Sequence, residues 1–255
     1  MSPSPHGREP PEGISGSARL SALWTLITRV ADEQQLPVGP GVLCRAAVAH
    51  LQVSAVAVAV PNVGLGSETI AHTGALALVG EDLQITVGQG PCLEALAGAG
   101  PLLVPDLATR AEQLRWPLFA PGAVEAGVLS MCALPMRIGV ARFGVLAVYL
   151  DRVGGLDAAG VADAIGFAAI ALELLLDSFY NPTAAVREPN DHPEIHQATG
   201  MVSVQLGVDM PTALLRLRAR AFSEGRLLFG LARDVVSRAV RLDDELDASS
   251  DDLPP

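Results

Sequence analysis

The sequence contains no lysine and few aromatic residues. All 17 basic side chains are arginine, and Phe, Trp and Tyr together make up 4% of the 255 residues. Half of the residues are hydrophobic, so the chain can bury a sizeable core, which must consist mainly of Ala, Val and Leu. Together with a charged fraction of only 18%, this composition excludes a largely disordered protein.

Cysteine is scarce as well. Cys44, Cys92 and Cys132 are widely spaced and form no CxxC pair, which argues against a disulfide framework or a zinc site. Residues 1–17 are rich in Pro, Gly and Ser and lack the apolar stretch of a signal peptide, so we expect a disordered arm. A reducing cytoplasm is the expected location.

Neither a metal nor a membrane is expected. Among the histidines, only His192 and His196 have a metal-like spacing, and no third ligand accompanies them. The most apolar segment, 158–176, is interrupted by Asp163 and Glu173, which leaves a run shorter than the roughly 20 residues of a membrane span. We expect no cofactor and no transmembrane helix.

The pattern of residues 18–178 predicts an α/β (α+β) domain with a central antiparallel sheet flanked by helices. Glycine and Trp-Pro turns in 88–96 and 115–127 each lead into a short helix. Asp157 is a natural cap for the last helix. The longer helices are expected at 18–35, 41–51 and 157–178, and the strands at 54–62, 68–73, 102–105, 128–136 and 142–150.

A linker at 179–192 precedes an all-α domain at 193–242. Its three helices are expected at 193–206, at 209–223 with Asp209 as the cap, and at 226–240. Three short helices with tight joints predict a three-helix bundle, which is too small to be an enzyme scaffold on its own.

Charge is distributed unevenly along the chain. The net charge of −11 argues, taken whole, against a nucleic-acid partner. Residues 211–242, however, hold seven arginines and only two acidic residues, Glu224 and Asp234. Residues 243–255 form an acidic tail with six carboxylates and no base. An unstructured, solubilising tail is one interpretation, and a decoy for the arginines is the other.

The first domain resembles a known sensor family. GQGPCLEAL (88–96), PLLVPDL (101–107), RWPLFA (115–120) and CALPMRIGVARFGVLAVYL (132–150) are similar to the GAF family of small-molecule-sensing domains, in the form common in actinobacterial regulators. The resemblance implies a GAF-like fold and a small-molecule ligand, although the domain can also have kept only a dimerisation role.

Residues 194–240 resemble the ANTAR family of RNA-binding antitermination domains. The similarity includes Ala-Thr-Gly-Met-Val (198–202) in the first helix, and Thr199 departs from the lysine that many members have there. The resemblance implies dimers that bind RNA stem-loops in leader transcripts and favour antitermination, with no catalysis. A hydroxyl group at Thr199 can still bind RNA by a hydrogen bond.

The candidate RNA-binding residues lie in this second domain. Guanidinium groups bind phosphates and stack on loop bases, while the alternative is a merely solvated helix face. Arg216 and Arg220 share a face, but Arg218 lies about 200° around the helix, so all three cannot touch one RNA surface. The candidates are Thr199, Gly200, Arg216, Arg218, Arg220, Arg226 and Arg233.

Three residues of the first domain are candidate ligand contacts. A cysteine near a helix start, such as Cys92, can be reactive, but a small buried residue is the simpler interpretation. Trp116 and Phe119 can line a pocket or simply fill the core.

The apolar helix at 157–178 needs cover on more than one side, which favours a homodimer. The rival functions are a dimerising interaction module without RNA binding and a cysteine-dependent redox enzyme or sensor that uses Cys92.

Overall fold

The computed structural model describes residues 17–62, 64–98, 100–180 and 193–242. The chain divides into two compact units, residues 1–191 and 192–255, and each is described by itself. The disordered arm expected at 1–17, most of the linker and the acidic tail lie outside the described residues, as does His192.

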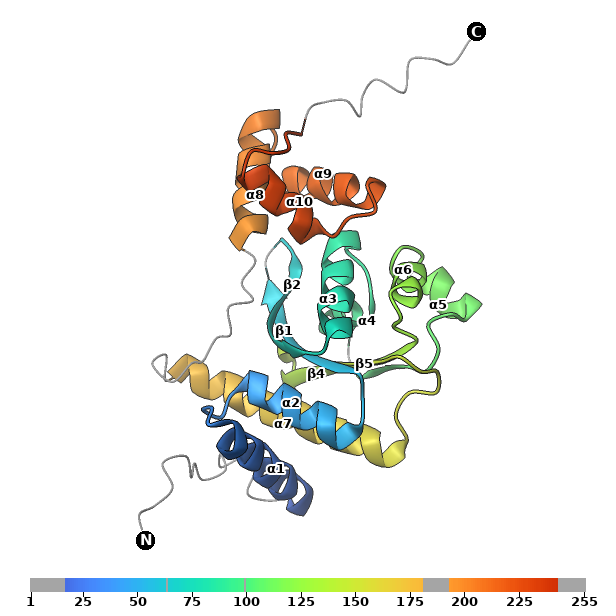
Figure 1. Ribbon diagram of the computed structural model, residues 1–255, viewed down its shortest axis with the longest axis vertical. Coiled ribbons are helices and arrows are strands. Elements are labelled where there is room, and N and C mark those ends of the chain that lie inside the picture. The colour runs from blue at the N-terminus through green and yellow to red at the C-terminus, as the bar shows by residue number, and fades with distance from the viewer. Residues whose placement is uncertain (1–16, 63, 99, 181–192, 243–255) are drawn as a thin grey trace. The chain divides into compact units, whose positions relative to one another are not determined.

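The first unit is built on one antiparallel sheet of five strands (Figure 1). The strands follow the spatial order β2-β1-β5-β4-β3, and every neighbouring pair is antiparallel, which confirms the predicted sheet. The strands are β1 (Ala55–Asn62), β2 (Gly66–Thr73), β3 (Leu102–Val104), β4 (Ser130–Ile138) and β5 (Ala141–Leu150).

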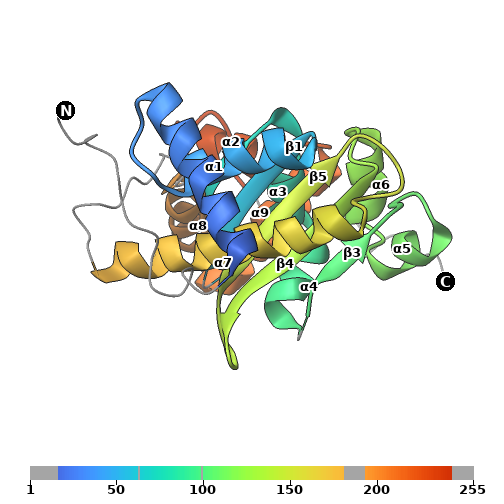
Figure 2. The same cartoon turned by 90° about the horizontal axis from the view of Figure 1, so that it is seen from below.

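Helices cover both faces of this sheet, as Figure 2 shows for the face under α1, α2 and α7. On that face lie α1 (Ala18–Gln34), α2 (Pro40–Leu51) and α7 (Ala158–Tyr180), and on the other lie α3 (Ala75–Val87), α4 (Pro91–Ala97), α5 (Arg110–Arg115) and α6 (Phe119–Glu125). The two faces carry separate hydrophobic clusters, so the sheet is buried on both sides.

The sequence of β1 assigns different side chains to the two faces. Val56 and Val58 enter the cluster under α1, α2 and α7, whereas the alternating Ala57 and Ala59 enter the cluster under α3 to α6. Alanine recurs on the second face of neighbouring strands, because Ala147 of β5 is the cross-strand partner of Ala57 and Ala133 of β4 is the partner of Ala147. This row of small residues leaves room for helices to lie close to the sheet.

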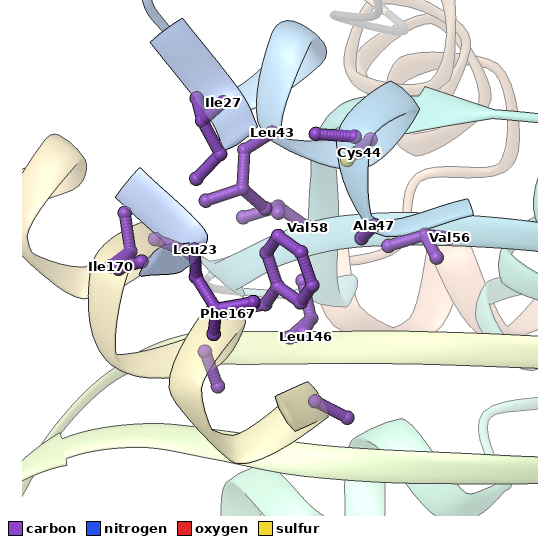
Figure 3. Packing of buried hydrophobic residues seen from close by; sticks show 14 of the residues in the cluster. Leu23, Ile27, Leu43, Cys44, Ala47, Val56, Val58, Leu146, Phe167 and Ile170 are labelled. Carbon is purple, nitrogen blue, oxygen red and sulfur yellow. The ribbon is translucent and has the colours of Figure 1, made fainter. Parts of the chain in front are cut away.

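Part of the apolar helix α7 is covered by its own chain. Phe167 and Ile170 are fully buried beside Leu23 and Ile27 of α1 and Leu43 of α2 (Figure 3). Helices α1 and α2 thus cover one side of α7, whereas Ile165 of the same helix is 47% exposed, so the expected homodimer stays a prediction. Asp157 caps the helix as expected, with its carboxylate accepting from the Gly160 N–H at 2.7 Å.

By length and composition, α7 could cross a membrane, which corrects the expectation that its apolar run is too short. An 18-residue window within residues 158–178 has a mean hydropathy of 1.9 despite Asp163 and Glu173. Half of this stretch is buried inside the unit, which is the environment of a core helix. Asp163 also joins the three helices, since it pairs with Arg19 of α1 and lies 2.9 Å from His50 Nε2 of α2.

The second unit contains the helices α8 (Pro193–Leu206), α9 (Met210–Ser223) and α10 (Leu228–Val236), each in contact with the other two. Asp209 caps α9 by accepting from the Thr212 N–H at 2.8 Å, as the sequence predicts. Helix α10 is shorter than predicted because Arg238 adopts a left-handed backbone conformation (φ 63°) that ends it. The buried side chains are Ile195, Ala198, Val202, Ala213, Leu214, Leu217, Ala221, Leu228, Leu231, Ala232 and Val235.

Candidate functional site

An open groove runs along α8 in the second unit. It has a volume of about 800 Å³ and is bounded on one side by α8 and on the other by the end of α10 and the residues after it. Its lining combines apolar, amide and basic side chains. The lining residues are Gln197, Gly200, Met201, Val204, Gln205, Val235, Arg238, Val240 and Arg241.

Of the neighbouring candidates Thr199 and Gly200, only Gly200 lines the groove. Thr199 is buried, and its hydroxyl group donates to the Ile195 carbonyl at 2.6 Å, so it is engaged within α8. Gly200 lines the groove, and a Cβ atom at this position would meet nothing within 4 Å. The backbone at Gly200 is therefore the more accessible of the two, and the hydroxyl proposed for RNA faces the helix core instead.

The α9 arginines differ in their surroundings. Arg220 forms an ion pair with Glu224, one turn along the chain. Arg218 is half-buried, and this burial lowers the pKa of its guanidinium group. Arg216 makes no ion pair within the described parts of the chain. The three side chains therefore do not form one continuous basic surface, as helical geometry predicts.

Two further candidates, Arg226 and Arg233, lie near α10. Arg226 pairs with Asp234 and, at 3.3 Å, with Glu224, and these carboxylates raise the pKa of its guanidinium group. Arg233 is exposed and lies over the Phe229 ring at 5.6 Å. Arg226 thus stabilises the unit, whereas Arg233 presents its charge to solvent.

Sequence reasoning missed Arg238 and Arg241 as site residues. Both are exposed, line the groove and make no ion pair with any residue that the structure describes. Both residues follow the end of α10. The predicted helix continues to residue 240, and in such a helix their side chains would have had other directions. The only sign of them in the sequence was that both belong to the group of seven arginines in residues 211–242.

In the first unit, the predicted ligand contacts lie together in the cluster under α3 to α6. Cys92 and Phe119 are fully buried, and Trp116 is 3% exposed. The Trp116 and Phe119 rings meet edge to face at 6.5 Å. Glu94 of α4 accepts from the Trp116 indole N–H at 3.1 Å and pairs with Arg115, so α4 is attached to the end of α5.

A buried polar cluster that the sequence does not predict adjoins Cys92. The carboxyl group of Glu81 on α3 accepts from the Tyr149 hydroxyl at 2.6 Å, from the Thr69 hydroxyl at 3.4 Å and from the Cys92 thiol at 3.5 Å. Gln84 donates to the Tyr149 hydroxyl at 3.1 Å and accepts from the Cys92 N–H at 2.7 Å. These groups come from β2, α3, α4 and β5, and they are all fully or nearly fully buried.

Gly90 makes this arrangement possible. Its φ of 144° is unfavourable for other residues, and a Cβ atom there would lie 2.5 Å from Gln84 Oε1. The glycine turn expected before α4 therefore brings the loop onto the Gln84 side chain. On β2, Ser67 is fully buried two residues before Thr69, and its hydroxyl group has no partner among the described residues.

Burial dominates the electrostatics of this cluster. It raises the pKa of Glu81 despite the opposing hydrogen bonds from Tyr149, Cys92 and Thr69, so the neutral carboxylic acid is favoured. Burial likewise raises the pKa of the Cys92 thiol well above its ordinary value, and the nearby Glu81 raises it further. A reactive thiolate needs the opposite environment.

Within the described residues, no group of three His, Cys, Asp or Glu side chains could hold a metal ion. The signals missed by sequence reasoning were Glu81, which follows the apolar run 75–80, and Tyr149, one of only two tyrosines.

No family model matches the chain, and no curated protein matches it. The GAF domain of an Acinetobacter phosphoenolpyruvate-protein phosphotransferase has 10% identity and a TM-score of 0.45, with 64% of this chain and 98% of that chain covered. The free methionine-R-sulfoxide reductase of Neisseria meningitidis has 13% identity and a TM-score of 0.43, with 64% and 86% covered.

A domain of a Sinorhizobium meliloti two-component sensor histidine kinase has 15% identity and a TM-score of 0.41, with 55% of this chain and 92% of that chain covered. At these identities and TM-scores, no activity or ligand is transferred to this chain. None of the three is described as an antitermination protein. The five-stranded antiparallel sheet with helices on both faces fits a GAF-like α/β fold.

Proposed function

We propose that the chain is a signal-responsive transcription antitermination regulator that binds RNA stem-loops in leader transcripts through its second unit. The observation that carries this proposal is the groove along α8 in a chain whose net charge is −11, because Arg238 and Arg241 line this groove, are exposed and form no ion pair with the residues that the structure describes. An acidic protein that gathers arginine beside an open groove has the local charge that phosphate binding requires.

The chemistry of the groove suits RNA. Exposed guanidinium groups bind phosphates, and the side-chain amides of Gln197 and Gln205 can donate to and accept from base edges. Unpaired loop bases also need apolar surface, and Val204 is 87% exposed on the groove wall. The bare backbone at Gly200 allows close approach. These features favour the binding of a stem-loop with an open loop rather than of a uniform duplex.

The arginine candidates divide into two roles under this proposal. Arg233, Arg238 and Arg241 are exposed and would contact RNA, as would Arg216 on the neighbouring helix. Arg220 and Arg226 are held by Glu224 and Asp234 and would act by positioning the joint between α9 and α10.

The first unit would supply the sensor. The support is that polar side chains converge beside an apolar cluster and that the Ser67 hydroxyl group has no partner among the described residues, since small-ligand sites combine apolar lining with a few polar groups. We propose no catalytic role, because burial raises the pKa of the only thiol in this cluster. A homodimer in the cytoplasm remains part of the proposal.

The test is a filter-binding titration with an RNA that carries two tandem hairpins, at about 0.05 M and about 0.3 M salt. We expect loop-dependent binding that weakens with salt and falls at least about tenfold in the double variant Arg238→Asn/Arg241→Gln. Asparagine tolerates the left-handed conformation at residue 238. Arg142→Gln, which removes an exposed arginine of β5 in the first unit, serves as the control for charge loss outside the groove.

Binding that ignores the loop or the salt concentration would contradict the proposal. No binding by any variant would leave the dimerising interaction module as the better explanation of the second unit.

A further inference from the structure

We infer that the groove along α8 is the docking site of the chain's own acidic tail, residues 243–255, and that this segment competes there with RNA. The inference deepens the proposed function by naming its regulator. It begins from the groove itself, which Met201 and Val204 line together with Gln197 and Gln205 of the same helix and with Arg238 and Arg241.

Helix α8 has an apolar surface that the second unit does not cover. Ile195, Ala198 and Val202 point into the core, as the spacing of a core-facing stripe requires. Met201 and Val204 lie on a second stripe, and Val204 is 87% exposed. An aliphatic side chain with this exposure, on a helix whose opposite face is already buried, is suited to contact with a further segment.

The tail has the complementary chemistry. The sequence Asp-Asp-Glu-Leu-Asp (243–247) alternates carboxylates with one leucine, and Asp251, Asp252 and Leu253 repeat this combination. Carboxylates form paired hydrogen bonds with guanidinium groups, and leucine suits contact with the apolar Met201 and Val204 side chains of the groove. No basic residue in 243–255 opposes this attraction.

The position of the tail makes the encounter intramolecular. Leu242 is 5% exposed and directly precedes the tail, and Arg241 of the groove precedes Leu242. A segment that starts at the edge of its own binding site has an effective concentration in the millimolar range. Even weak docking would therefore keep the groove occupied until RNA displaces the tail.

The experiment compares the full chain with a full-length neutral-tail variant, in which the six acidic residues of 243–255 become Asn or Gln. A fluorescent synthetic peptide of residues 243–255 is titrated with each protein, and its anisotropy is followed at about 0.05 M and about 0.5 M NaCl. We expect the peptide to bind the neutral-tail variant at least fivefold more tightly than the parent chain, and to dissociate at high salt.

Adding Arg238→Asn/Arg241→Gln to the neutral-tail variant should weaken peptide binding at least tenfold, whereas adding Arg142→Gln in the first unit should change it less than twofold. Equal peptide binding by the parent and the neutral-tail variant would overturn the inference. So would binding that is insensitive to the two groove substitutions. If dilution of the parent chain makes it bind the peptide as tightly as the neutral-tail variant does, the groove is occupied by the tail of a second copy. That outcome would also overturn the intramolecular contact.

RNA binding separates this inference from the proposed function. If the neutral-tail variant binds the tandem-hairpin RNA about tenfold more tightly than the parent, while Glu125→Gln, which neutralises an exposed acid of the first unit, does not bind it more tightly, the competition is supported. If neither protein binds RNA but the peptide results hold, the tail docks in the groove and the RNA function fails.

Discussion

Gly80 of α3 lies directly against the ring of Tyr149 of β5, since a Cβ atom at Gly80 would be 2.4 Å from Cε1 of that ring. The ring is fully buried, and its hydroxyl group is held by Glu81 and Gln84 of the same helix. The glycine therefore fixes how close α3 comes to the sheet, and the hydrogen bonds fix its register.

Replacing Gly80 with alanine should destabilise the first unit by about 1–3 kcal/mol, because the new methyl group overlaps a ring that cannot shift. Helix propensity alone predicts a gain of roughly 1 kcal/mol, so the sign of the effect distinguishes the two causes. Urea unfolding followed by circular dichroism measures it. A more stable Gly80→Ala variant would mean that the ring moves freely.

The same substitution at Gly200 should have the opposite effect on stability. A methyl group on α8 at this position meets nothing within 4 Å, so Gly200→Ala should stabilise the second unit by about 0.5–1 kcal/mol. It should also weaken RNA binding, because the methyl group enters the groove. If the variant is more stable and binds RNA as tightly as the parent, the backbone at Gly200 does not contact RNA.

Glu81→Gln should remove a pH dependence of stability. Burial raises the pKa of Glu81 in the folded chain, so the stability present below the unfolded pKa of about 4.5 is lost as the pH rises through the folded pKa. The glutamine variant keeps an acceptor for Tyr149 and should differ from the parent by less than about 1 kcal/mol at pH 4.5.

At pH 8, Glu81→Gln should therefore be the more stable of the two chains. Urea midpoints at both pH values give the comparison, with Glu68→Gln on the same sheet as the control. A parent chain that is no less stable than the variant at pH 8 would show that Glu81 ionises without cost.

Asp163 should have the opposite pH dependence. Desolvation raises the pKa of its carboxyl group, but hydrogen bonds and charges from His50 and Arg19 outweigh this effect and lower the pKa. The stability it contributes is present above the unfolded pKa of about 3.9 and is lost as the pH falls through the folded pKa. Asp163→Asn should cost about 1 kcal/mol at pH 7, because the partners are partly exposed, and nearly nothing at pH 2. Thermal unfolding at the two pH values measures the difference.

Cys92 should be unreactive in the folded protein. Because burial raises its pKa and removes it from solvent, iodoacetamide at pH 7.5 should alkylate it at least about a hundredfold more slowly than in the urea-unfolded chain. Peptide mass spectrometry reports each cysteine separately, and the buried Cys44 serves as an internal comparison. Rapid labelling of Cys92 alone would restore the redox alternative.

The strands and most helices could be predicted from the sequence because their patterns are local. The alternation in β1, the two-residue turn Gly139-Val140 and the caps Asp157 and Asp209 are all visible in a few consecutive residues. Helix α3 was missed because Ala75–Val87 lacks a helix cap and contains a glycine, and its register depends on contact with Tyr149, 69 residues beyond Gly80.

The candidate sites were less predictable for the same reason. The Glu81 cluster joins groups from four elements, and no short motif marks such a combination. In the second unit, the arginine-rich composition indicated a basic surface, but only the early end of α10 places Arg238 and Arg241 at the groove. Composition thus indicated which unit carries the candidate RNA-binding site, whereas the structure was needed to show which arginine side chains line it.

The row of alanines across β1, β5 and β4 constrains how this protein can change during evolution. Ala57, Ala147 and Ala133 are side by side and fully inaccessible beneath α3 to α6. A larger residue at one of them needs compensating change in the helix above, so accepted substitutions should occur in combination. On the opposite face, Val56 and Val58 can exchange for other aliphatic residues at smaller cost, and adjacent codons of one strand should therefore diverge at different rates.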